Sequence, residues 1–281
     1  MARILAISSQ VARGHVGLSA IVPTLQRLGH EVTALPTILL SNHPGHAKVA
    51  GQQVAPDLLR RVLDALEANG WLSETDAVIT GYLPSISHVE VAIDAIGRVT
   101  SNRSDARILV DPVLGDEPKG VYIDRSAAER IRDELVPLAD TVTPNAFELG
   151  WLTSIAITSI AGALGACEAL TPRYVLATSV PGDRQTELEN LLFERGTGKA
   201  LACTVTRQDR VPNGTGDFLS ALYLGHGLRG MAAGDALAVS IGGVDAAIKA
   251  SVGHDELQLA SSQAAWADAG PWPVRLARTE C

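Results

Sequence analysis

The chain has 281 residues, of which 46% are hydrophobic and only 4% aromatic, and its formal net charge at pH 7 is −8. Such a composition supplies a large aliphatic core, and the acidic charge argues against a nucleic-acid-binding surface, which is normally basic. No run approaches the ~20 apolar residues of a membrane span, and the N-terminal run is too short for a signal peptide. The three cysteines show neither metal-binding nor redox spacing. We therefore expect a soluble, cytoplasmic protein with no nucleic-acid or membrane partner.

Strand and helix patterns alternate along the chain. They predict strands at 3–7, 31–35, 77–79, 108–110, 141–143 and 174–177, and helices at about 18–28, 55–68, 89–99, 126–135 and 160–170. An antiparallel hairpin at 191–194 and 200–205 and two helices at about 216–228 and 232–251 follow. Repeated strand–helix units predict a three-layer α/β/α fold with a central, mostly parallel sheet and an antiparallel edge. No linker-like tract divides the chain, so we expect residues 1–281 to form a single domain.

Polar residues follow five of the predicted strands at their carboxyl ends. In parallel sheets ligands bind beyond these ends, so the side chains should gather at one edge and form the candidate active site. The residues concerned are Ser8 and Ser9, Gly81 and Tyr82, Asp111 and Asp116, Thr143, Asn145 and Glu148, and Thr178 and Ser179.

The segment PNGTGD at 212–217 precedes a predicted helix and places Asp217 directly after a glycine loop. Gly214 and Gly216 allow the backbone amides to turn inward, and the helix N-terminus adds partial positive charge, so the loop suits an anion. Asp217 then fits a general base for a substrate hydroxyl, with the loop stabilising a migrating phosphoryl group. The alternative is an aspartate that merely belongs to a glycine-rich helix cap.

Two of the polar groups suit a nucleotide–metal site. Asp111, Asp116 and Glu148 carry the hard oxygen ligands that Mg²⁺ prefers, directly or through water. Asn145 and Glu148 stand three apart at a predicted helix start and therefore share a face. The alternative assigns these residues to turns, caps and a favourable first-turn charge.

Several segments, in order along nearly the whole chain, resemble a known family. The GTGD loop, the NxxE motif at Asn145 and Glu148 and the segment DPVLGD are similar to those of the ribokinase superfamily. Within it, six segments resemble the pyridoxal kinase family: ISSQVARGHVGLSA, TILLSNHPGH, GYLPS, DPVLGDEPKGVYI, TPNAFEL and DELQL. The resemblance implies a ribokinase-like fold and ATP-dependent phosphorylation of the 5′-hydroxyl of pyridoxal, with pyridoxine or pyridoxamine as further substrates, in pyridoxal 5′-phosphate salvage.

The same resemblance implies roles for individual residues. Asp217 would be the base, and the backbone of Gly214, Thr215 and Gly216 the anion hole. Substrate contacts would come from Ser9, Val16, His43, Tyr82 and Asp217. Contacts to ATP would come from Asp111, Asn145, Glu148, Thr178, Ser179, Val211, Gly214 and Gly216. Asp116 and Glu148 would hold Mg²⁺, and Asp111, Thr143 and Thr178 would surround K⁺ or Na⁺. Residues 116–122 would form a phosphate-covering flap with Lys119 as a contact, and the protein would be a homodimer.

Three departures from the family pattern bear on substrate and nucleotide. Pro44 replaces a threonine after the SNH run, Leu18 replaces an asparagine after the GHVG run, and no lysine stands at Thr178–Ser179. The alternatives are a kinase for another small alcohol, such as hydroxymethylpyrimidine or a sugar, and a non-catalytic vitamin or nucleotide sensor. The intact GTGD loop disfavours the sensor.

Histidines of the N-terminal loops complete the candidate residues. His15, His43 and His46 stand beside glycine or proline and lack the spacing of a metal triad. We therefore assign them no chemical step, and expect only His43 to line the substrate pocket.

Overall fold

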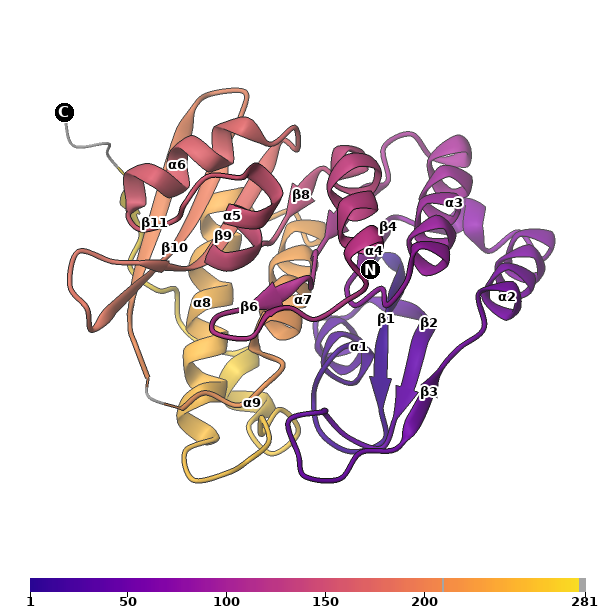
Figure 1. Cartoon of the computed structure of the whole chain (residues 1–281), viewed down its shortest axis with the longest axis horizontal. Coiled ribbons are helices and arrows are strands. Elements are labelled where there is room, and N and C mark those ends of the chain that lie inside the picture. Colours follow the sequence, from indigo (N-terminus) through magenta and orange to yellow (C-terminus); the bar gives the residue numbers. More distant parts are fainter. Residues whose placement is uncertain (209, 278–281) are drawn as a thin grey trace.

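The computed structural model describes residues 1–208 and 210–277. Its centre is a ten-stranded sheet in the order β12-β11-β10-β9-β8-β5-β4-β1-β2-β3 (Figure 1). Strands β9, β8, β5, β4, β1 and β2 pair in parallel, and β10, β11 and β12 at one edge and β3 at the other pair antiparallel. The strands of this sheet are β1 (Arg3–Val11), β2 (Glu31–Leu40), β3 (Gly51–Gln53), β4 (Ala77–Thr80), β5 (Arg107–Val110), β8 (Thr141–Val142), β9 (Tyr174–Pro181), β10 (Glu187–Glu194), β11 (Lys199–Thr206) and β12 (Arg275–Leu276).

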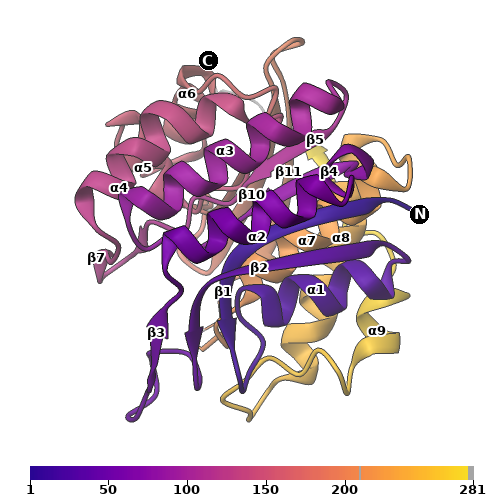
Figure 2. The same cartoon turned by 90° about the vertical axis from the view of Figure 1, so that its right-hand side faces the viewer.

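Helices cover both faces of the sheet because successive strand residues point to opposite sides. In β1, Leu5 and Ile7 join one apolar cluster, and Ile4 and Ala6 join the other. Figure 2 shows the two helical layers with the sheet between them. One layer comprises α2 (Pro56–Ala68), α3 (Ile86–Asn102), α4 (Arg125–Arg130), α5 (Ala146–Thr153) and α6 (Ile160–Ala169); the other comprises α1 (Leu18–Arg27), α7 (Thr215–Leu228), α8 (Ala233–Ala250) and α9 (Gln263–Ala267). The predicted three-layer fold is confirmed.

Three predicted strand ends were clearly too early: β2 continues to Leu40, and the other two errors concern polar residues of the site. Strand β1 continues to Val11 and β9 continues to Pro181, so Ser8, Ser9, Thr178 and Ser179 lie within strands rather than after them. Pairing resumes beyond these residues: β1 pairs with β2 again at Gln10 after a register shift at Ser9, and β9 pairs with β10 again at Val180 after a register shift at residues 178–179. Hydrogen bonding to neighbouring strands therefore overrides the polar side chains that predicted a strand end.

Other local predictions also need correction. The helix expected at 126–135 is α4 followed by a wider π turn at Ile131–Leu135. The short strands β3 and β12, the helix α9 and the ribbon of β6 (Gly115–Asp116) and β7 (Gly120–Val121) were not predicted, because two to five residues carry no readable periodicity. None of the helices in the described parts of the chain is long and apolar enough to cross a membrane.

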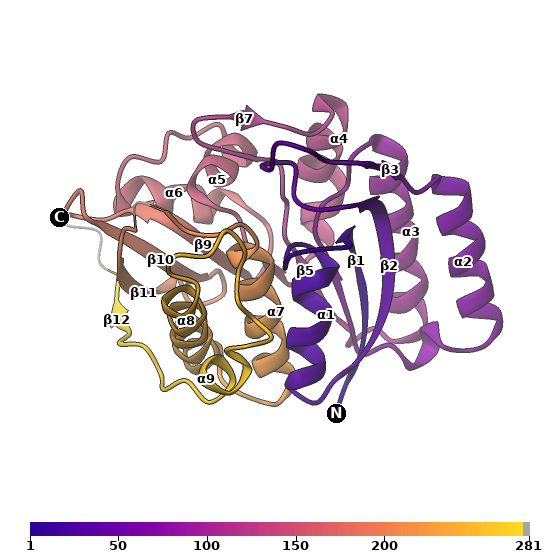
Figure 3. The ribbon, with the colours of Figure 1, turned by 90° about the horizontal axis from the view of Figure 1, so that it is seen from below.

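Helix α7 carries Asp217 and is held firmly by its neighbours. Figure 3 shows α7 between α1 and α8. Phe218, the residue after Asp217, is fully buried and meets the Trp266 ring edge-on, with ring centroids 5.2 Å apart and planes at 80°. Since the side chain next to Asp217 is locked in the core, the start of α7 has a fixed position relative to the sheet.

We predict that Phe218→Ala lowers the free energy of unfolding by about 3–5 kcal/mol, because it removes a fully buried ring and leaves a cavity. Urea denaturation of the purified variant measures this loss. Val252→Ala, at a side chain that is 79% exposed, is the matched control and should change stability by less than about 0.5 kcal/mol. A loss in Phe218→Ala no larger than in the control would contradict the packing described for α7.

Candidate active site

Asp217 lies in the first turn of α7, behind a loop whose backbone only glycine can adopt. Gly214 precedes the helix with φ of +97°, and a Cβ at this position would overlap the carbonyl oxygen of His15. Burial raises the pKa of Asp217 to about 6, and a hydrogen bond from the Gly17 backbone opposes that rise. The site thus holds a carboxylate that is more basic than usual beside the amides of a helix N-terminus.

The predicted substrate side lies against Asp217. A Cβ on Gly81 would stand 3.7 Å from Asp217 Oδ1 and would overlap Ser8 Oγ, so β4 ends close to the carboxylate. The half-buried Ser9 packs its side chain on Gly17. Gly17 therefore lies against both Ser9 and Asp217, and the assignment of Ser9 and Asp217 to one substrate site stays a prediction.

Flanking side chains complete this region. Val16 is buried against Gly214, and a Cβ on Gly214 would lie 3.2 Å from Val16 Cγ1. The half-buried Tyr82 donates its backbone N–H to Ser8 Oγ at 3.1 Å, and burial raises the pKa of its phenol. Ser8 was named only as a strand-end residue. Its structural role here had no sequence signal, because it depends on contact with β4.

A chain of hydroxyl groups connects Asp111 with Thr143. Ser220 on α7 donates its hydroxyl to Asp111 Oδ2 at 2.9 Å, and Ser220 Oγ lies 2.9 Å from Thr143 Oγ1. Burial, together with the charges of Glu148 and Asp217, raises the pKa of Asp111 well above its ordinary value. Sequence reasoning missed Ser220, although its position three residues after Asp217 places it on the same face of α7.

Glu148 is held by backbone amides on both carboxylate oxygens. Oε1 accepts from Leu114 N at 2.8 Å, and Oε2 accepts from Asn145 N at 2.9 Å, while Asn145 Oδ1 accepts from Glu148 N. These last two bonds form the capping box of α5. Burial raises the pKa of Glu148 to about 7 in spite of these donors. Glu148 is therefore part of a helix cap, as the alternative reading states. It also lies near the carboxylates of Asp111 and Asp116.

Asp116 differs from Glu148 because one of its oxygens is uncompensated. Oδ1 is buried and has no hydrogen-bond partner among the residues described, while Oδ2 lies 3.6 Å from Lys119 Nζ. Asp116 belongs to the ribbon β6–β7, which corresponds to the predicted flap. An orphaned buried carboxylate oxygen is what a cation or its water would satisfy.

The acidic side chains alone do not form a closed metal site. Across residues 1–208 and 210–277, no three His, Cys, Asp or Glu side chains converge closely enough to hold a metal ion. A cation at Asp116 would therefore need further oxygens from water or a phosphate group, which is the usual situation for Mg²⁺ bound with a nucleotide.

Two of the residues predicted to contact ATP, Asn145 and Ser179, line a neighbouring cavity. Asn145 donates its side-chain amide to Gly115 O at 2.9 Å, and Thr178 donates its backbone N–H to Pro144 O at 2.9 Å. Ser179 is exposed with φ of +55°, and Val211 is 40% exposed. The cavity has a volume of about 890 Å³, and its lining includes Asp116, Asn145, Phe147, Trp151, Ser179 and Arg207. Its size, and a mostly apolar lining that carries a few polar and charged side chains, suit a nucleotide-sized ligand.

Comparison with known proteins agrees with this geometry. The sequence pattern of the phosphomethylpyrimidine kinase family matches residues 13–260 of this chain. The pyridoxal kinase PdxY of Deinococcus radiodurans is 37% identical over 271 residues, 92% of this chain and 91% of that protein. The PdxY of Leifsonia xyli subsp. xyli is 36% identical over 272 residues, 95% of this chain and 96% of that protein. The crystallised pyridoxal kinase of Leishmania donovani, in complex with ADP and pyridoxamine, has a TM-score of 0.93 at 27% identity and covers 99% of this chain and 100% of its own.

These similarities define the class first: a ribokinase-like α/β/α protein of the group described as phosphomethylpyrimidine kinases. Coverage extends over nearly the full length on both sides, so the likeness is not limited to one motif. Within that class, the chain belongs to the pyridoxal kinase family.

We predict that Gly214→Ala destabilises the fold and Gly216→Ala does not. Alanine at Gly214 must adopt a positive φ, which costs about 1–2 kcal/mol, and must also displace the His15 carbonyl. Gly216 lies in the same loop, but its Cβ would meet nothing within 4 Å, so it is the matched control. The free energy of unfolding from urea titration measures both variants, and equal stability of the two would contradict the described loop geometry.

Proposed function

We propose that this chain is an ATP-dependent kinase that phosphorylates the 5′-hydroxyl of pyridoxal, and of pyridoxine or pyridoxamine, in pyridoxal 5′-phosphate salvage. The observation that carries the proposal is the Asp217 carboxylate, which is desolvated at a helix N-terminus between Ser9 and the glycine loop. Relatives from Bordetella avium and Bordetella bronchiseptica, each 33% identical, bear the name pyridoxine/pyridoxal/pyridoxamine kinase. That name supports the wider set of substrates.

Asp217 acts as general base in this proposal. With a pKa of about 6 it is mostly ionised at pH 7, yet it binds a proton more readily than an exposed aspartate. It accepts the proton of the 5′-hydroxyl while that oxygen attacks the γ-phosphorus of ATP, and the bond from this phosphorus to the β–γ bridging oxygen breaks to release ADP. The backbone of residues 214–216 points the positive end of α7 at the transferred group and so stabilises its charge. Positioning and charge stabilisation supply most of the acceleration.

The two acidic residues proposed to hold Mg²⁺ differ in how well they suit direct binding of the ion. Asp116, with its uncompensated Oδ1, is the better direct ligand, whereas Glu148 already accepts amide hydrogens on both oxygens and would act through water. When bound, Mg²⁺ neutralises phosphate charge. Asp111, Thr143 and Thr178 are the proposed neighbours of a monovalent cation, K⁺ or Na⁺, and two of them already share the Ser220 hydroxyl.

A hydroxymethylpyrimidine kinase is the second candidate, favoured by the description of the matching family. Both candidates share the phosphoryl-transfer site and differ in the ring that they accept. Pro44 and Leu18, where the chain departs from the family pattern, lie in the substrate-side segments. A single 1–281 kinase domain, the homodimer and the cytoplasmic location stay predictions.

Asp217→Asn should fold, bind ATP and lose nearly all turnover, because an amide cannot accept the hydroxyl proton. It should also be at least as stable as the wild type near neutral pH, since a desolvated charge is removed. The measurements are kcat in a coupled ADP-release assay, ATP binding by calorimetry, and urea unfolding. Turnover close to that of the wild type would exclude Asp217 as the base.

The pH profile provides a separate prediction. Burial raises the folded-state pKa of Asp217, so protonation removes the base as the pH falls through about 6. We expect kcat/KM to fall by about tenfold per pH unit or more below that pH, where the base is lost. Steady-state rates between about pH 5 and 8, with circular dichroism as the control for folding, test this. A profile that stays level down to pH 5 would show that Asp217 does not titrate in the rate-limiting step.

A further inference from the structure

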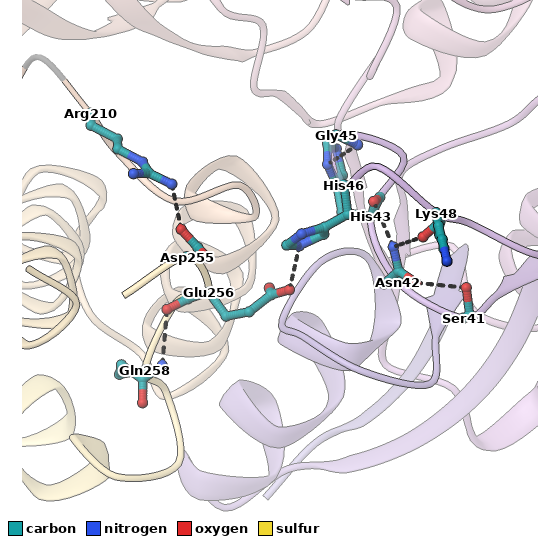
Figure 4. Close-up of polar contacts among 10 residues, drawn as sticks. All are labelled: Ser41, Asn42, His43, Gly45, His46, Lys48, Arg210, Asp255, Glu256 and Gln258. Atoms are coloured by element: carbon teal, nitrogen blue, oxygen red, sulfur yellow. Dashed lines mark hydrogen bonds and ion pairs between the residues drawn. The ribbon is translucent and has the colours of Figure 1, made fainter. Parts of the chain in front are cut away.

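A polar contact joins two loops that are far apart in sequence at the rim of the site. His46 Nε2 lies 2.8 Å from Glu256 Oε1, and the Glu256 side chain is only 17% exposed (Figure 4). His46 comes from the substrate-side segment SNHPGH, and Glu256 from the segment DELQL between α8 and α9. Neither residue belongs to the apolar core, so this contact fastens the loops to each other without contributing to core packing.

Glu256 also contacts the loop that precedes α1. Gly14 has φ of +98°, and a Cβ there would overlap the Glu256 carboxylate. The same loop is bonded to the substrate-side segment, because Ala12 and Arg13 donate their amides to Leu40 O and Ser41 O at 2.8 and 3.0 Å. One carboxylate thus touches two loops that are themselves side by side.

The segment around His46 is rigid within itself. Asn42 donates its side-chain amide to His43 O at 3.1 Å and to Lys48 O at 3.0 Å, and Gly45 N donates to His43 Nδ1 at 3.0 Å (Figure 4). Because the segment is cross-bonded, a tether at His46 holds it as a unit.

The tethered segment faces the catalytic loop. A Cβ on Gly45 would be 3.7 Å from Asn213 Nδ2, just before the glycine loop that leads to Asp217. Arg210 forms an ion pair with Asp255, so the chain leading into that loop is fixed to the same C-terminal segment. His43 is half-buried, and burial, followed by the charge of Lys119 on the flap, lowers its pKa. Residues 42–46 therefore lie beside the residue that precedes the glycine loop of Asp217.

We propose that Glu256 is a positioning residue that holds residues 42–46 over the substrate pocket through His46, and so sets the affinity for the ring substrate. This inference rests on the proposed pyridoxal kinase function. Glu256 touches no reacting atom; it acts through His46 and Gly14. Losing the tether should weaken binding of the ring substrate and leave the ATP side, built by β8, β9 and α5, nearly unaffected.

The kinetic test compares His46→Ala, Glu256→Ala and the double variant. Each single change should raise KM for pyridoxal about tenfold, the effect of losing one charge-assisted hydrogen bond, while kcat and KM for ATP stay within about twofold. The double variant should be no worse than the singles, because both remove the same contact. His46→Gln, which keeps an N–H donor, should recover part of the affinity. Unchanged KM for pyridoxal, or an equal rise for ATP, overturns the proposal.

Limited trypsin digestion gives a readout that is independent of the substrate. Lys48 follows the tethered segment and accepts a hydrogen bond from Asn42 within it, so cleavage after Lys48, followed by mass spectrometry, should be several-fold faster in both alanine variants than in the wild type. Asp245→Ala, which breaks the Lys249–Asp245 pair on α8, is the control and should leave this rate unchanged. Equal cleavage in all proteins overturns the tether. If cleavage is faster in the alanine variants but the wild type does not phosphorylate pyridoxal, the tether is supported and only the proposed function is contradicted.

Discussion

The approach of Gly214 to the His15 carbonyl is the constraint on which the candidate site depends. It brings the start of α7 against the loop after β1, and no side chain larger than hydrogen fits between them. Asp217 is thereby half-buried near Gly17, while Phe218 anchors the next residue in the core. The high basicity of Asp217 is thus a consequence of backbone packing.

Desolvation of carboxylates is the cost of this arrangement. Burial raises the pKa values of Asp111, Glu148 and Asp217, and at Asp111 the charges of Glu148 and Asp217 add to the rise. Backbone amides around Glu148 and the Ser220 hydroxyl on Asp111 offset only part of the cost. A site with surplus negative charge and an uncompensated oxygen on Asp116 is best suited to a ligand that brings cations with it. This is the physical reason why the acidic edge and the amide-rich loop occur together.

Much of the fold and site could be predicted from the sequence because the relevant signals are local. Helix and strand periodicity identified the alternating elements, and the glycines of 212–217 identified a special backbone. What could not be predicted depends on contacts between distant segments. The continuation of β1 through Ser8 and Ser9 requires β2 as a partner, and the role of Ser220 requires knowing which face of α7 meets Asp111.

The contact between His46 and Glu256 shows the same limit more strongly. These residues are 210 positions apart, and a histidine between glycine and alanine in a loop gives no local sign of its partner. Glu148 shows the reverse case, since its local capping pattern was readable while its desolvation by the surrounding fold was not.

The most direct test of the account is ATP consumption by the wild-type protein with pyridoxal, pyridoxine, pyridoxamine and hydroxymethylpyrimidine in parallel. Phosphorylated products identified by mass spectrometry show which hydroxyl was modified. The account predicts the highest kcat/KM with a B6 vitamer and a phosphate on its 5′-oxygen. Preferred turnover of hydroxymethylpyrimidine, or binding of pyridoxal without any ATP consumption, would contradict it.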